Sequence, residues 1–181
     1  MAKSIALFRG INVSGKNKIN MRSLTQILAE FGLKNIHTYV QSGNVIFDQE
    51  RKSDPELGEK IGSRINAQYG FQPKILLLSA KELDAAIKNN PFSEAENDPS
   101  SFHLGFLEKV PVSPKLEKLK TIKKDSEEFA LIGKVFYLKA PEGIGRSKLA
   151  ANSEKLLGEV MTDRNWRTVL KIREMVNIED T

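Results

Sequence analysis

Cysteine is absent from this chain of 181 residues, and histidine and tryptophan are scarce, with two and one copies. Without cysteine the chain can form no disulfide, thiolate metal site or cysteine nucleophile. His37 and His103 lie in opposite halves and have no second histidine or carboxylate at ligand spacing, so we expect no metal site and no bound cofactor. A nucleophilic serine motif of the form G-x-S-x-G is also missing. The sequence therefore names no catalytic residues.

Long apolar runs are missing as well. No segment approaches the roughly 20 apolar residues that cross a bilayer, and the apolar part of residues 1–9 is too short for a signal peptide. Hydrophobic residues make up 40% and charged residues 28%, which is typical of a globular chain. These features predict a soluble, cytoplasmic protein with no membrane partner.

The net charge of +5 is concentrated at the start of the chain. Residues 1–40 contain six Lys or Arg residues and one acidic residue, Glu30. Such an excess can attract a polyanion, and it can equally be a solvated face of a folded domain. The charge alone does not decide between the two.

The hydrophobic pattern of residues 1–90 predicts four strands and the helices between them. We expect strands at 4–9, 36–41, 45–48 and 72–78. One helix should begin after Asn20 and end before Gly32, and a second should begin at 54–55 and end before Gly70. The order β-α-β-β-α-β is typical of a ferredoxin-like fold.

A short helix and a linker follow this first half, and the same order of elements recurs after residue 101. Ser79 and Glu82 form a capping box for a short helix that ends at Asn90, and the polar residues 91–101 are the expected linker. Later strands are expected at 102–107, 128–132, 135–138 and 160–162, with helices after 113, at 147–157 and from Trp166 onward. We therefore predict an α+β protein: two ferredoxin-like (α-β plait) halves with antiparallel sheets, residues 1–90 and 102–181, plus a C-terminal helix.

The loop at residues 10–17 resembles a phosphate-binding P-loop but departs from it. It matches G-x-x-x-x-G-K, yet Asn17 stands where a hydroxyl must ligate magnesium. The following helix begins only near Met21, and an antiparallel plait is the wrong scaffold for such an enzyme. A simpler interpretation is that the loop's free amides, with Arg9, Lys16 and Lys18, hold an anion.

Two later segments have similar chemistry. Residues 143–148 form a glycine-rich turn into a helix, where Arg146 could pair with phosphate or carboxylate and Ser147 could cap the helix. Residues 162–168 hold the only tryptophan, Trp166, between two arginines. Trp166 could stack on a ligand, but its helical spacing to Val169 favours packing in the core.

A nucleic acid is a further possible partner, because RNA-recognition modules share this element order. They display aromatic side chains on the first and third strands, for which Phe8 and Phe47 are the candidates. The third strand lacks the Gly- and Phe-rich signature of such modules, so we favour a small anionic ligand.

Five sequence blocks resemble the bacterial family called domain of unknown function 1697. They lie at residues 6–16, 21–24, 38–45, 145–148 and 162–168. The resemblance implies a fold of two α-β plaits and implies no activity. This chain has Ser14 where the family pattern leads us to expect glycine, a mild change for a site built from backbone amides.

The resulting hypothesis is a binding protein for a ligand that carries phosphate or carboxylate. The alternative is an enzyme acting on a phosphorylated or nucleotide substrate by a reaction that the sequence does not indicate. The candidate ligand-binding residues are Arg9, Asn12, Lys16, Ser42, Asn44, Arg146, Ser147, Lys148, Arg164, Asn165 and Trp166.

Overall fold

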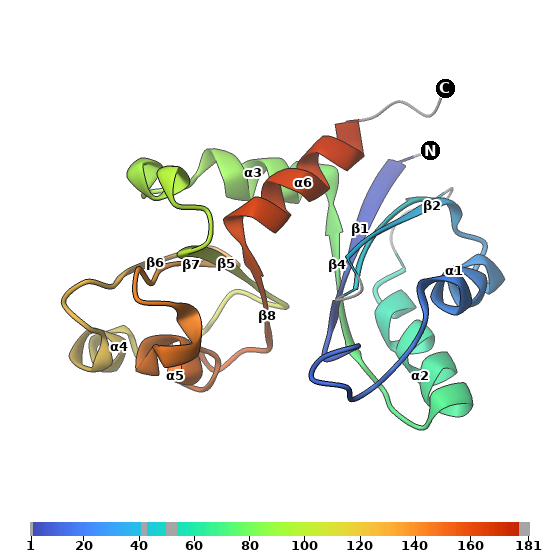
Figure 1. The fold of residues 1–181 in the computed structure, drawn as a ribbon, viewed down its shortest axis with the longest axis horizontal. Coiled ribbons are helices and arrows are strands. Elements are labelled where there is room, and N and C mark those ends of the chain that lie inside the picture. The colour runs from blue at the N-terminus through green and yellow to red at the C-terminus, as the bar shows by residue number, and fades with distance from the viewer. Residues whose placement is uncertain (1, 41–42, 50–53, 178–181) are drawn as a thin grey trace. The chain divides into compact units, whose positions relative to one another are not determined.

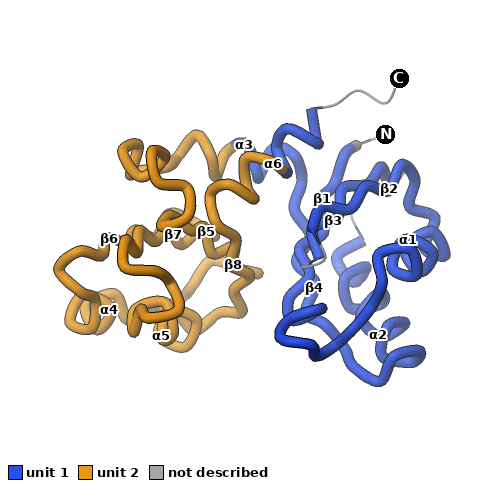
Figure 2. Tube along the Cα trace, in the orientation of Figure 1, with its two compact units in different colours: residues 1–84, 172–181 blue, residues 85–171 orange. Residues whose placement is uncertain are grey.

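The computed structural model describes residues 2–40, 43–49 and 54–177. The chain forms two compact units, which Figure 2 shows in different colours. The first unit comprises residues 1–84 and 172–181, and the second comprises residues 85–171. Each unit is described by itself below.

The first unit contains a four-stranded antiparallel sheet with strand order β2-β3-β1-β4. Two helices, α1 and α2, lie on one face of this sheet (Figure 1). This is the predicted ferredoxin-like topology. Its elements are β1 (Ala2–Arg9), α1 (Met21–Glu30), β2 (Lys34–Tyr39), β3 (Asn44–Gln49), α2 (Leu57–Tyr69) and β4 (Lys74–Ser79).

Local signals in the sequence define the helix ends of the first unit. The side chain of Asn20 accepts a hydrogen bond from the Ser23 amide at 2.7 Å and so caps α1, as predicted. Gly70 ends α2 with a φ of 75°, a left-handed conformation that glycine adopts without a steric penalty. At the other end of α1, Arg64 of α2 donates two hydrogen bonds to the Glu30 carboxylate, at 2.7 and 2.9 Å.

The core of the first unit lies between the sheet and the two helices. It includes Phe8 and Phe47 from the strands and Leu24 and Ile61 from the helices. A Cβ atom on Gly58 would come within 2.8 Å of the Ile75 carbonyl oxygen, so the absence of a side chain there lets α2 approach β4 closely.

The second unit repeats the plait, with strand order β6-β7-β5-β8 and all pairs antiparallel. Helices α4 and α5 cover one face of its sheet (Figure 1). Its elements are the 3-10 helix η1 (Ser93–Asn97), β5 (Phe102–Leu107), α4 (Leu116–Ile122), β6 (Glu128–Ile132), β7 (Val135–Lys139), the 3-10 helix η2 (Ile144–Arg146), α5 (Lys148–Leu157) and β8 (Met161–Asn165).

An aromatic cluster lies on the other face of the second sheet, and Phe102 is at its centre. The ring of Phe102 is 5.1 Å from that of Trp166, 6.3 Å from that of Phe92 and 6.4 Å from that of Tyr137. Phe102, Tyr137 and Trp166 are each at most 1% exposed. These centroid distances are in the range at which aromatic pairs attract one another.

The remaining two helices, α3 (Ala80–Lys88) and α6 (Trp166–Asn177), each contribute residues to both units. The predicted capping box of α3 is confirmed: the Glu82 carboxylate accepts from the Ser79 amide at 2.8 Å, and Ser79 Oγ accepts from the Glu82 amide at 3.2 Å. The expected linker, residues 91–101, contains η1. The separate folding of residues 1–90 and 102–181 stays a prediction.

Several boundaries differ from the sequence-based ones, and two of them lie at strands β8 and β2. The last strand, β8, extends to Asn165, beyond the expected 160–162, because its backbone pairs with β5 from Met161 opposite Leu107 to Asn165 opposite His103. Strand β2 begins at Lys34, earlier than expected, since residues 34–39 pair with β3 through a bulge between Lys34 and His37. Pairing between distant segments, which periodicity does not encode, decided both boundaries.

The burial of Trp166 gives a first testable prediction. We expect Trp166→Ala to lower the free energy of unfolding by about 3–5 kcal/mol, because it leaves a cavity beside Phe102. The neighbouring Arg167 is exposed, so Arg167→Ala is the matched control and should change stability by less than about 0.5 kcal/mol. Urea denaturation followed by circular dichroism measures both. Equal midpoints for the two variants would contradict the core role of Trp166.

A second prediction concerns Tyr137, whose hydroxyl donates to the Ala86 carbonyl at 2.6 Å. Burial raises the pKa of Tyr137 from 10.0 to about 12. Between pH 10 and 12 the unfolded chain therefore releases a proton that the folded chain retains, and stability should fall as pH rises through this window. Tyr137→Phe should be about 1–3 kcal/mol less stable at pH 8, since Ala86 loses its donor, and should lose this part of the alkaline decline. Urea titrations at several pH values test both effects; parallel pH profiles would contradict them.

Candidate functional site

The loop between β1 and α1, residues 10–20, has an unusual backbone. Five of its residues have positive φ: Gly10, Asn12, Ser14, Gly15 and Asn17. Residues in the left-handed conformation turn the chain repeatedly. Val13 and Lys16 pair with each other in an isolated antiparallel β-bridge. The loop therefore folds back on itself and exposes its tip, residues 13–18.

Two asparagines hold the loop together. Asn12 pairs with the backbone of Ile19, donating from Nδ2 to its carbonyl at 2.8 Å and accepting at Oδ1 from its amide at 2.9 Å. Asn17 donates from Nδ2 to the Gly10 carbonyl at 2.7 Å. The sequence predicted Asn12 as a ligand-binding residue, and the structure shows its amide group engaged in closing the loop.

The turn between β2 and β3 lies beside this loop. The Phe8 amide, near the end of β1, donates to the Gly43 carbonyl at 2.8 Å. A Cβ atom on Gly43 would lie only 2.7 Å from Cδ1 of Ile11, so only glycine allows the two segments to approach this closely. Asn44 is fully buried and donates to the Tyr39 carbonyl at 2.9 Å. Ser42, another predicted site residue, falls outside the described residues.

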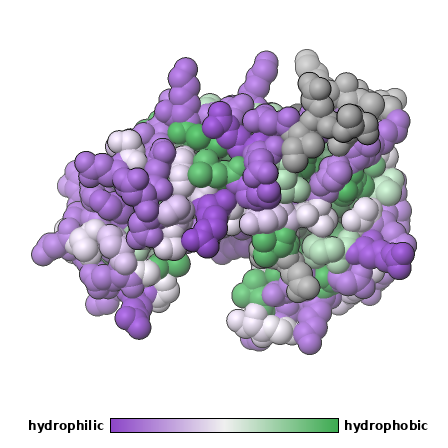
Figure 3. Space-filling model, turned by 45° about the horizontal axis from the view of Figure 1, so that its top comes forward, coloured by the Kyte–Doolittle hydropathy of each residue, from purple (hydrophilic) through white to green (hydrophobic). Residues whose placement is uncertain are grey.

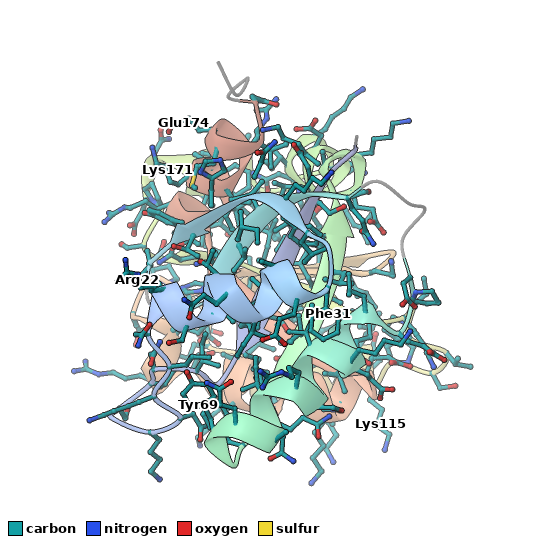
Figure 4. All side chains as sticks on the ribbon, turned by 90° about the vertical axis from the view of Figure 1, so that its right-hand side faces the viewer. Arg22, Phe31, Tyr69, Lys115, Lys171 and Glu174 are labelled. Carbon is teal, nitrogen blue, oxygen red and sulfur yellow. The ribbon has the colours of Figure 1, made fainter. Side chains whose placement is uncertain are left out.

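Cations dominate this end of the first unit. Residues 9–22 include Arg9, Lys16, Lys18 and Arg22 and contain no acidic residue. All four are exposed. Lys16, Lys18 and Arg22 form no ion pair with any residue that the structure describes. Figure 4 shows Arg22 at the end of α1 that the loop reaches, opposite Phe31.

The same loop presents unpaired amides. In the described part of the chain, the backbone N–H groups of Ser14, Gly15 and Lys18 donate no hydrogen bond. An exposed amide beside a lysine is a favourable position for an anionic oxygen, because the amide dipole and the ammonium charge act together. We call residues 9–22 the basic loop.

The other predicted residues lie together at one end of the second sheet. His103, near the start of β5, pairs with Asn165 at the end of β8. The Ala140 amide, just after β7, donates to the Ser101 carbonyl at 2.8 Å. The turn that leads to Arg146, Ser147 and Lys148 begins at Ala140. The basic loop belongs to the first unit and this group to the second.

Three of these residues have structural roles. Ser147 is 3% exposed, and its Oγ accepts from the Ala150 amide at 2.9 Å, which caps α5. Asn165 caps α6 by accepting from the Thr168 amide at 2.9 Å. Trp166 is 1% exposed and packs on Phe102, as the core interpretation predicts.

Two of the three cations of this second group, Arg146 and Arg164, have acidic neighbours. Hydrogen bonds from Lys124 and Ser126 lower the pKa of Glu142, and the charge of Arg146 contributes. Burial lowers the pKa of Arg164 to about 10, while the charge of Asp163 opposes that shift. The guanidinium of Arg164 also donates to the Asp163 carbonyl at 2.8 Å. An incoming anion would therefore meet carboxylates here, in contrast to the basic loop.

A histidine–aspartate pair in the second unit was missed by sequence reasoning. His103 Nδ1 lies 2.9 Å from Asp163 Oδ2, and His103 Nε2 lies 3.2 Å from the Ser100 carbonyl oxygen. The pairing of β5 with β8 creates this contact between residues 60 positions apart. Because both ring nitrogens have an oxygen partner, neither is available as a catalytic base in this conformation. No spacing in the sequence could have indicated the pair.

An RNA-recognition surface loses support. Phe8 and Phe47, which an RNA-recognition surface would have to display, are 1% and 0% exposed and belong to the core. Among the described residues, no group of three or more His, Asp or Glu side chains is arranged to hold a metal ion. No described helix combines the length and apolarity needed to cross a membrane.

The family model for a protein of unknown function, DUF1697, matches residues 1–137. The chain belongs to the DUF1697 family. This confirms the resemblance seen in the sequence blocks; the matched range includes the basic loop and ends before the blocks at 145–148 and 162–168. No protein of curated function matches this DUF1697 chain.

A solved structure has the same fold as this DUF1697 protein. It is the conserved bacterial protein SP0830 from Streptococcus pneumoniae, which is 28% identical, with a TM-score of 0.74. The match covers 97% of this chain and 99% of that one. The likeness therefore extends over both plaits, and it carries no activity with it.

The role of Asn12 yields a third prediction. Asn12→Ala should lower the free energy of unfolding by about 1–3 kcal/mol, because the Ile19 amide and carbonyl lose both partners. Lys18→Ala, at an exposed position of the same loop, should leave stability within about 0.5 kcal/mol of the unsubstituted protein. Urea denaturation compares the two. A loss as large in Lys18→Ala would contradict the assignment of loop closure to Asn12.

Proposed function

We propose that the basic loop binds the phosphate or carboxylate group of a small ligand. The observation that carries this proposal is a set of cations and amides on one exposed loop that have no partner among the described residues: Lys16, Lys18 and Arg22 with the amides of Ser14, Gly15 and Lys18. Phosphate and carboxylate oxygens accept hydrogen bonds from both kinds of donor.

The basic loop is a better candidate than the residues at the end of the second sheet. The side-chain oxygens of Ser147 and Asn165 already accept hydrogen bonds from helix amides. Arg146 and Arg164 have Glu142 and Asp163 nearby. A cation with a carboxylate neighbour offers an added anion less net attraction. We therefore assign Lys16, Lys18 and Arg22 to the ligand.

Binding by this loop would be electrostatic and sensitive to salt. The cations are exposed, so ions in solution screen their attraction over about 10 Å at 0.1 M ionic strength. The backbone amides add direction, because Asn12 and Asn17 hold the loop in one shape before the ligand arrives. The proposal is a binding function; it assigns no bond-making step to any residue.

A titration with inorganic pyrophosphate tests this proposal. Calorimetry should show binding that weakens with salt, and nuclear magnetic resonance should show the Ser14, Gly15 and Lys18 amides shifting on addition. We expect Lys16→Met to weaken binding several-fold and to reduce the salt dependence, since one cation is removed. Lys118→Met is the control, because Lys118 is an exposed lysine of the second unit.

The outcomes separate clearly. Amide shifts confined to the basic loop, together with a loss in Lys16→Met alone, would support the site. Equal losses in Lys16→Met and Lys118→Met would indicate general charge attraction and would contradict it. An absence of binding in the unsubstituted protein at low salt would contradict it as well.

A further inference from the structure

Exposed aliphatic side chains are rare on this protein and are not scattered. Of the six large hydrophobic residues that are exposed in the described chain, four lie on two kinds of loop. These are the loop after the first strand of each plait and the hairpin turn between its second and third strands. A fifth, Ile132, is the last residue of β6, next to such a turn. The face seen in Figure 3 is mostly hydrophilic, with hydrophobic residues in small groups.

In the first unit the two exposed aliphatic residues are Val13 and Val40, at 53% and 54% exposure. Val13 belongs to the basic loop, and its bridge partner is Lys16. Val40 belongs to the neighbouring turn, and its carbonyl accepts from the Gly43 amide at 3.3 Å. Gly43 packs against Ile11, so the two loops meet there. Val13 follows Ile11 by two residues and Val40 precedes Gly43 by three.

Val40 is the less expected of the two. Its φ is 59°, a region that β-branched residues rarely occupy because of steric conflict with their own backbone. Asparagine or glycine would be more stable at this φ. With half of its side chain in solvent, Val40 also contributes little to the core. Its aliphatic surface is therefore held partly in solvent at a φ that disfavours valine.

We propose that the ligand of the basic loop carries an aliphatic group next to its anionic one, and that Val13 and Val40 contact this group. The inference rests on the proposed function and specifies its ligand class: a soluble phosphate or carboxylate attached to an alkyl or acyl chain. The cations and amides would hold the anionic oxygens, and the valines would remove part of the chain from water.

A membrane surface also combines anionic groups with acyl chains, but it fits the loop less well than a free ligand does. Loops that enter a bilayer interface usually present Trp or Phe, or a helix with a wide apolar face. Here residues 10–20 contain no aromatic residue, and the exposed tip is otherwise Ser14, Gly15, Lys16, Asn17 and Lys18. We therefore commit to a free ligand and keep vesicles as a separate arm of the test.

The experiment compares inorganic phosphate with methyl, butyl and hexyl phosphate on the full chain, by calorimetry and amide shifts. We expect affinity to rise by about twofold per methylene, below the roughly fourfold of complete burial. Val13→Ser and Val40→Asn should each reduce the hexyl-to-methyl affinity ratio. Val40→Asn suits the positive φ, so a loss of the ratio in this variant is not a folding defect; thermal denaturation verifies that.

Val112→Ser is the matched control. Val112 is 93% exposed on the equivalent loop of the second unit, where Glu108 and Glu117 accompany the lysines. Its substitution should leave the hexyl-to-methyl ratio unchanged. A ratio that falls equally in Val112→Ser would show non-specific adsorption and overturn the proposal.

The failures of the two proposals are distinguishable. If phosphate binds at the basic loop but all alkyl phosphates bind equally, the aliphatic part of the ligand is wrong and the anion site stands. If neither phosphate nor any alkyl phosphate binds, the proposed function itself fails. Binding to phosphatidylserine vesicles that Val13→Ser abolishes, without binding of hexyl phosphate, would replace the free ligand by a membrane surface and overturn the inference.

Discussion

Both plaits are built around a first strand that is buried on its two sides. Ile5, Ala6, Leu7 and Phe8 of β1 are at most 1% exposed, and every residue of β5 is buried. Since successive side chains of a strand point to opposite faces, both faces of each sheet must be covered. The centre of each sheet therefore has no polar surface for a ligand, and recognition is left to the loops at the strand ends.

At those strand ends, polar side chains have two different uses. Asn12, Asn17, Ser147 and Asn165 satisfy backbone groups and hold loops or helix ends in shape. Several lysines and arginines, among them Lys16, Lys18 and Arg146, are exposed to solvent. The two units differ in the acidic residues near their cations. In the second unit, carboxylates are close to Arg146 and Arg164. In the first unit, residues 9–22 contain no Asp or Glu. This difference in local charge is the main reason to place the anion in the first unit.

The basic loop combines a backbone held by side-chain hydrogen bonds with three cations, Lys16, Lys18 and Arg22, that form no ion pair with the described residues. Positive φ angles at the non-glycine residues Asn12, Ser14 and Asn17 cost conformational energy, which the Asn12 and Asn17 hydrogen bonds offset. The strained Val40 and the exposed Val13 add an aliphatic component beside the charge. A ligand with only an anionic group would not account for these valines, whereas an anion with an attached chain would. Because the chain belongs to the DUF1697 family, the proposal of an anionic ligand with an attached chain can also be tested in other members of the family.

The sequence alone determined the element order, the helix caps at Asn20, Ser79 and Ser147, and the glycine stops at Gly70 and Gly158, because these depend on residues close together in the chain. It also located the basic loop, since charge and glycine content are local. Only the tertiary structure decided the extent of β8, the contact of His103 with Asp163, the burial of Phe8 and Phe47, and the proximity of Gly43 to Ile11. Each of these joins segments far apart in the sequence, and strand pairing and side-chain packing, which periodicity does not specify, bring them together.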